Sequence, residues 1–134
     1  MSQFQEGDRT LAKETEYVNM FVQDGIFQCY FKPMEVLDIN VAHVTVRDRL
    51  NFLKKNSYPS LFDISEVKQT TKEARDFMAN EGNELVLASA MIVSNPMLKM
   101  MANFYVMVNK PKNPTKLFTD VNSALEWLAQ FKAK

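Results

Sequence analysis

Few residues of this chain have the type and spacing that catalysis or metal binding requires. His43 is its one histidine and Cys29 its one cysteine, and neither has a pair of carboxylates spaced four residues apart beside it, as a helical metal site would need. No Gly-x-Ser-x-Gly segment offers a nucleophilic serine, and three glycines are too few for a glycine-rich phosphate loop. We therefore expect no metal, no cofactor and no enzymatic activity.

Asp63 and Arg75 are the charged residues whose positions are most suggestive. Asp63 closes a short apolar segment typical of a strand, and Arg75 lies in the helix predicted after it. Ligands often bind at the carboxyl ends of parallel strands. A single carboxylate, however, does no acid–base catalysis alone. We therefore expect a structural role, in which the two side chains pair or each caps nearby backbone.

Thr70 and Thr71 precede the same helix. Thr70-Thr71-Lys72-Glu73 fits a capping box, with Thr70 as the cap and Glu73 reaching back to its amide. A phosphate added here would instead place negative charge at the positive end of a helix. Capping is the interpretation that we favour, and phosphorylation remains an alternative.

The composition narrows the class of protein. The 134 residues include 16 Lys and Arg and 16 Asp and Glu, for a net charge of zero, and 46% are hydrophobic. A nucleic-acid-binding protein needs a basic face, and a disordered chain is less apolar, so neither class fits. The first residues lack the basic and apolar regions of a secretory signal, and no apolar run is long enough to span a membrane. We expect a cytoplasmic protein.

The chain starts with a polar segment, residues 1–16, that we interpret as a loose arm before a single domain at 17–134. Two β-rich runs, 17–22 and 26–31, flank Asp24-Gly25, which predicts a hairpin. Four helices then alternate with three strands. The predicted helix caps are Asn40, Thr70, Asn95 and Asp120, and the predicted strands are 60–64, 85–93 and 115–118. This order predicts an α/β fold in one layered domain, with a mixed five-stranded sheet.

The helix predicted at 96–109 is the most informative segment. Only Lys99 and Asn103 interrupt its apolar residues before Asn109, whereas a helix that covers a sheet needs only one apolar stripe. A second surface must therefore cover its other side: neighbouring helices, a second copy of the chain, another protein or an apolar ligand. The residues that we assign to this interface or pocket are Met97, Met100, Met101, Phe104, Tyr105, Met107 and Val108.

Three local patterns resemble the anti-sigma factor antagonist-like group, which has the STAS fold and is related in architecture to CRAL-TRIO lipid-binding domains. The patterns are Leu61-Phe62-Asp63-Ile64 with the later Thr70-Thr71-Lys72-Glu73-Ala74-Arg75, Asn103-Phe104 through Asn109-Lys110-Pro111, and Pro114 through Asp120 leading to Ala124-Leu125-Glu126-Trp127-Leu128. The resemblance covers residues 18–131 and is greatest to small uncharacterised bacterial members of the group.

The resemblance implies a regulatory role. In anti-sigma factor antagonists, a partner kinase phosphorylates the serine of an Asp-Ser pair at the start of a helix. Here the stretch is Gln69-Thr70-Thr71-Lys72, without that pair, so only Thr71 could substitute as the acceptor.

Together these observations predict a non-catalytic cytoplasmic module that binds a regulatory protein partner and forms a homodimer through the 96–109 helix. One alternative is a carrier of a small apolar ligand or lipid. Another is a switch controlled by phosphorylation of Thr71.

Overall fold

The computed structural model describes residues 11–132, in which a six-stranded sheet has the order β1-β2-β3-β5-β7-β8. Pairing is antiparallel from β1 to β3 and parallel from β3 to β8. The strands of this sheet are β1 (Leu11–Glu14), β2 (Val18–Gln23), β3 (Ile26–Phe31), β5 (Tyr58–Asp63), β7 (Val86–Ile92) and β8 (Thr115–Phe118). The five predicted strands and the mixed α/β fold are confirmed, but the sheet has six strands rather than five because β1 pairs with β2 at its edge.

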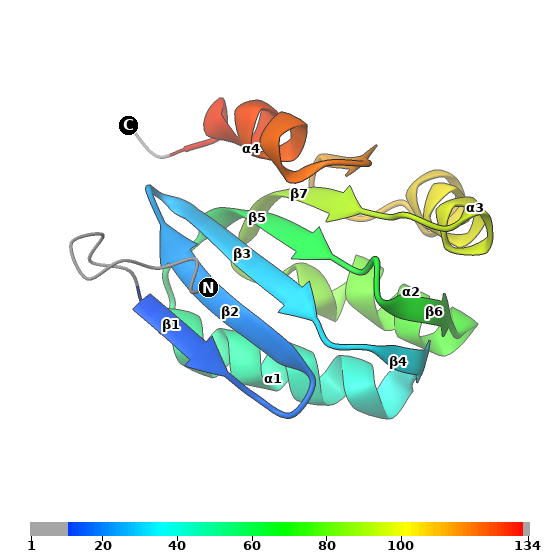
Figure 1. Cartoon of the computed structure of the whole chain (residues 1–134). Helices are drawn as coiled ribbons and strands as arrows, with labels where there is room; N and C mark the ends of the chain where they lie inside the picture. Colours follow the sequence, from blue (N-terminus) through cyan, green and yellow to red (C-terminus); the bar gives the residue numbers. More distant parts are fainter. Residues whose placement is uncertain (1–10, 133–134) are drawn as a thin grey trace.

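The helices are α1 (Ile39–Leu53), α2 (Lys72–Ala79), α3 (Pro96–Phe104) and α4 (Val121–Ala129). Two short helical segments join them, the 3-10 turn η2 (Glu81–Asn83) and the π-helical turn η3 (Tyr105–Asn109). Figure 1 shows α1 and α2 on one face of the sheet, α4 on the opposite face, and α3 beside β6 (Val67–Thr70).

The hairpin between β2 and β3 turns at Asp24 and Gly25, as predicted. Both residues have positive φ, 55° and 78°, which a two-residue turn needs to match the twist of its strands. Because this turn sets the register, Phe27, Cys29 and Phe31 face α1, and Ile26 faces α4.

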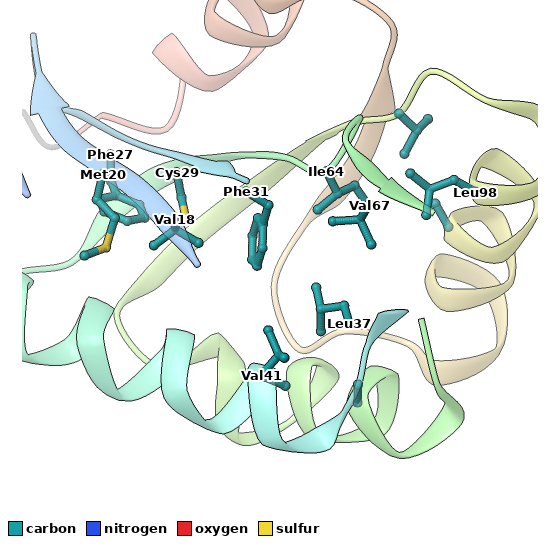
Figure 2. Close-up of a cluster of buried hydrophobic side chains, with 14 of the residues drawn as sticks. Val18, Met20, Phe27, Cys29, Phe31, Leu37, Val41, Ile64, Val67 and Leu98 are labelled. Carbon is teal, nitrogen blue, oxygen red and sulfur yellow. The ribbon is translucent and has the colours of Figure 1, made fainter. Parts of the chain in front are cut away.

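The main core lies between the sheet and the α1–α2 face. In Figure 2, Phe31 of β3, Leu37 just before α1 and Val41 on α1 point into a common space. Leu98 of α3 lies near Val67 in the same core. The central strand β7 is covered on both faces, as its continuous apolar run predicts.

A second, two-stranded parallel sheet pairs β4 (Met34–Leu37) with β6. Neither segment is among the strands predicted from the sequence, and the structure adds both to that prediction. Each strand has four residues and includes exposed charged side chains, such as Glu35 and Lys68, so its apolar pattern is too short to recognise. This small sheet matters for the site because α3 packs against β6.

The N-terminal boundary also differs from prediction. Leu11–Glu14 lies within the predicted arm, yet it forms β1 and pairs with β2. The rest of the predicted arm up to residue 10 lies outside the described residues.

Two predicted helix caps are wrong by one or two positions, and two are confirmed. The carboxylate of Asp38, rather than Asn40, accepts from the amide of Val41 at 3.0 Å. The hydroxyl of Thr71, rather than Thr70, accepts from the amide of Ala74 at 3.2 Å. Asn95 and Asp120 cap α3 and α4 as predicted.

Candidate functional site

The segment from α3 through η3 has an inner and an outer face. Leu98, Ala102 and Tyr105 are buried on the inner face, against the rest of the domain. The outer face, as we call it here, consists of Met97, Met100, Met107 and Val108, whose side chains are 55%, 65%, 73% and 57% exposed. Phe104 was assigned to the same site, but its side chain lies outside the described part of the chain.

The outer face is unusual for this molecule. Among the residues that the structure describes, five large apolar side chains are exposed, and all but Leu87 lie on the outer face. Neighbouring helices were one of the predicted covers for this side of the helix, but within the described chain they leave these four side chains exposed. Lys99 is the one charged residue from 96 to 109.

Specific contacts hold this segment at both ends. At its start, the side chain of Asn95 accepts from the amide of Leu98 at 2.7 Å. At its end, the Asn109 amide donates to the carboxylate of Asp76 on α2, and Asp76 also pairs with Lys72 at 2.9 Å. These contacts fix the orientation of the segment, and hence which of its residues face outward.

A cavity of about 70 Å³ lies beneath the inner face, between α2, α3 and the sheet, and is partly open to solvent. It brings together Met101 and Tyr105, two of the residues predicted for a pocket. Most of its other lining residues were not singled out, because they come from distant segments. The lining is Phe31, Leu37, Phe62, Ile64, Thr70, Ala74, Arg75, Met78, Gly82, Asn83, Ser89, Met91, Leu98, Met101, Ala102 and Tyr105.

The polar groups of the cavity are few. Arg75 donates from Nη1 to the carbonyl and to the hydroxyl of Thr70, at 3.0 and 2.9 Å. Thr70 in turn lies 3.9 Å from the sulfur of Met101. Burial raises the pKa of the Tyr105 phenol, so this side chain stays uncharged in the cavity wall.

Asp63 and Arg75 do not pair with each other, which was one of their two predicted roles. The carboxylate of Asp63 accepts from the backbone amide and the hydroxyl of Ser65, at 2.9 and 2.5 Å. Arg75 is bound to Thr70 instead. The physical reason is that each side chain already forms hydrogen bonds with a residue at most five positions away in the chain. Each side chain therefore has the other predicted role, which is a hydrogen bond to nearby backbone.

Thr71 is half-buried, and its hydroxyl is engaged as the cap of α2. Thr70 lies in the cavity wall and not at the cap position. Phosphorylation of Thr71 stays a prediction that none of these contacts tests.

The two lone candidate residues occupy structural positions. His43 packs its ring against Phe77, with 4.1 Å between ring centres. Cys29 is buried, and burial raises the pKa of its thiol to about 12. Among residues 11–132, no three His, Cys, Asp or Glu side chains gather in a group that could hold a metal ion.

The fold resembles solved structures, which confirms the STAS-like assignment. An uncharacterised protein of the DUF3478 family from Shewanella loihica PV-4, described as having a SpoIIAA-like fold, matches with a TM-score of 0.59 and 17% identity, over 87% of this chain and 98% of that one. The anti-sigma factor antagonist SpoIIAA, in its unphosphorylated form, matches with a TM-score of 0.52 and 8% identity, over 84% and 97%. At such low identity the likeness shows the fold alone.

Sequence comparison gives a family without an assigned function. Residues 20–132 match the family model described as Domain of unknown function (DUF7793). No curated protein matches the chain. No helix within residues 11–132 is long and apolar enough to cross a membrane.

Proposed function

The chain belongs to the DUF7793 family of domains of unknown function, and from that premise we propose that it is a non-catalytic cytoplasmic regulatory module that acts by binding protein. The observation that carries this proposal is the outer face of α3 and η3. Monomeric soluble proteins rarely leave large apolar side chains exposed in one group, and such groups mark interaction sites. Methionine suits such a surface because its flexible side chain adapts to a partner.

The occupant that fits this surface best is a second copy of the chain. The four residues of the outer face carry no charge, so a complementary surface must also be apolar. A two-fold symmetric dimer supplies such a surface, because the same patch contributes from both subunits. The contacts of Asn95 and Asn109 hold the patch in one orientation, which lowers the cost of ordering it on association.

Amide hydrogen exchange at two protein concentrations tests the proposal. In a homodimer, exchange in the peptide 96–109 slows when the chain is concentrated, whereas exchange in α4, on the other face of the sheet, does not change. Equal exchange of 96–109 at both concentrations contradicts the homodimer. Slowing of 96–109 only after a cell extract is added would assign the patch to a different protein partner.

A carrier of a small apolar ligand is a second candidate function, and the cavity beneath Leu98 and Met101 is the observation that favours it. A natural ligand would appear in native mass spectrometry as an added mass that is lost on denaturation. Protein that arrives empty and takes up no added apolar molecule contradicts this function and leaves the protein-binding proposal intact.

A further inference from the structure

Three polar residues of the cavity wall, Asn83 of η2, Ser89 of β7 and Tyr105 of η3, each carry a side-chain oxygen that forms no hydrogen bond within the described part of the chain. The residues are only 8%, 7% and 9% exposed. Asn83 is bound through its other polar atom, Nδ2, which donates to the carbonyl of Ala79 at 2.8 Å and leaves Oδ1 unpaired. Buried polar groups in native proteins almost always have a partner, so three such oxygens in one wall need an explanation.

These three oxygens remain accessible to a small molecule. Among the described residues, Nε of Arg75 is the one polar side-chain atom that is fully enclosed without a partner. The oxygens of Asn83, Ser89 and Tyr105 also lack a partner but are not enclosed in this way, so each keeps some accessible surface. Because the residues line the cavity and are nine-tenths buried or more, the cavity is the space from which a small molecule reaches them.

The hydrogen-bonding types of these oxygens define the headgroup that the cavity accepts. Oδ1 of Asn83 only accepts, whereas the hydroxyls of Ser89 and Tyr105 can each donate. A hydroxyl headgroup is their complement, because it has one proton to donate and two lone pairs that accept. A carboxylate has no proton for Asn83, and any ionic headgroup would lose its hydration against a mostly apolar wall.

The size and the rest of the wall define the remainder of the ligand. A water-sized group needs about 10–15 Å³ by the same measure, so 70 Å³ holds about five to seven non-hydrogen atoms. The wall that α3 contributes is apolar and consists of Leu98, Met101 and Ala102. A short aliphatic chain therefore suits this side of the cavity.

We infer that the cavity binds a short aliphatic alcohol. Its hydroxyl donates to Oδ1 of Asn83 and accepts from Ser89 and Tyr105, and its aliphatic chain lies against Leu98 and Met101. This inference rests on the second candidate function and specifies its ligand.

Titration of the isotope-labelled full chain, followed by nuclear magnetic resonance, tests the inference with butan-1-ol, methyl propyl ether, butanoate and butylammonium. The ether is an isomer of butan-1-ol that accepts hydrogen bonds but donates none. We expect butan-1-ol to bind about fivefold more tightly than the ether, because only the alcohol satisfies Asn83. The two ions should bind more weakly than the ether, and the shifted resonances should belong to residues that line the cavity.

Variants that remove single hydroxyls test the headgroup contacts. Ser89→Ala and Tyr105→Phe should each lower the affinity for butan-1-ol about threefold, because each removes one donor to the ligand. The matched control is Tyr58→Phe, since Tyr58 lies outside the lining of this cavity, and it should leave the affinity unchanged.

Three results would overturn the inference in different ways. Equal affinities of the wild-type chain for butan-1-ol and methyl propyl ether would remove the alcohol site but keep the apolar carrier. Tighter binding of butanoate than of butan-1-ol would assign the cavity to an anion instead. No binding of any probe would mean that the cavity holds water alone, and would remove the carrier as well.

Discussion

The guanidinium of Arg49, on α1, donates from Nη2 to the carbonyl of Gly82 at 2.6 Å. Its Nη1 donates to the carbonyl of Glu84 at 2.7 Å, so one buried side chain ties α1 to the turn that precedes β7. The group also lies over the ring of Phe62, 5.9 Å from its centre. Burial lowers the pKa of Arg49, but the two carbonyl oxygens accept hydrogen bonds from the guanidinium and so stabilise its charged form.

Replacement of Arg49 should therefore destabilise the fold. Arg49→Met removes two charge-assisted hydrogen bonds and leaves the Gly82 carbonyl without its donor, at a cost of roughly 2–4 kcal/mol in the free energy of unfolding. Urea denaturation measures this loss. The matched control is Arg47→Met, because Arg47 is exposed and forms a surface ion pair with its neighbour Asp48, so the change should stay within about 0.5 kcal/mol. Equal effects of the two substitutions would contradict the structural role of Arg49.

The start of α1 gives a second prediction. Asp38→Ala should lower the free energy of unfolding by about 1 kcal/mol, because the Val41 amide loses its acceptor. Asn40→Ala should have little effect or stabilise by a few tenths of a kcal/mol, since Asn40 is exposed within the first turn and alanine favours helix. Thermal or urea unfolding of both variants compares the two positions. The reverse order of effects would restore Asn40 as the cap.

The buried thiol gives a prediction about pH. The pKa of Cys29 is raised by burial from 9.0 to about 12 in the folded chain, whereas the unfolded chain exposes the thiol at its ordinary value. The unfolded state loses this proton first, so stability is full below pH 9 and falls between pH 9 and about 12. Tyr30, whose pKa is raised from 10.0 to about 12 by burial, adds to the fall above pH 10.

Urea midpoints measured from pH 7 to 11 check the alkaline loss. Cys29→Ala should flatten the curve above pH 9, and Tyr30→Phe should flatten it only above pH 10. An unchanged slope in Cys29→Ala would mean that the thiol is accessible to water, and rapid reaction of the native chain with a thiol reagent would support that result.

Local sequence signals predict much of the sheet. Asp24-Gly25 specifies its hairpin through backbone geometry, and the run at 85–93 specifies a strand buried on two sides. The caps Asn95 and Asp120 are right, and at Asn95 the proline that follows at the first helical position marks the start of the helix further. At Asp38 and Asn40, or Thr70 and Thr71, two good caps lie close together, and tertiary packing decides between them.

The residues of the candidate site are harder to predict from the sequence than the strands of the sheet. The apolar composition of 96–109 correctly marks the segment, but which residues face outward depends on how α3 packs on β6, a strand too short to predict. Met101 and Tyr105 therefore joined Met100 and Met107 in one predicted group, although the first two line the cavity and the others are exposed. The environment of Arg75 depends on contacts among several segments, which no local spacing reveals.

The molar mass of the purified chain in solution tests the proposed interface most directly. Light scattering at micromolar concentration should give about 31 kDa for the wild type, twice the 15.5 kDa chain. Met100→Glu and Met107→Glu should each shift the mass toward 15.5 kDa, because a carboxylate would be buried in an apolar interface. Asn122→Glu adds the same charge on exposed α4 and should keep the wild-type mass. A wild-type mass of 15.5 kDa, or Met100→Glu and Met107→Glu that remain dimeric, would contradict the proposal that the outer face joins two copies of this chain.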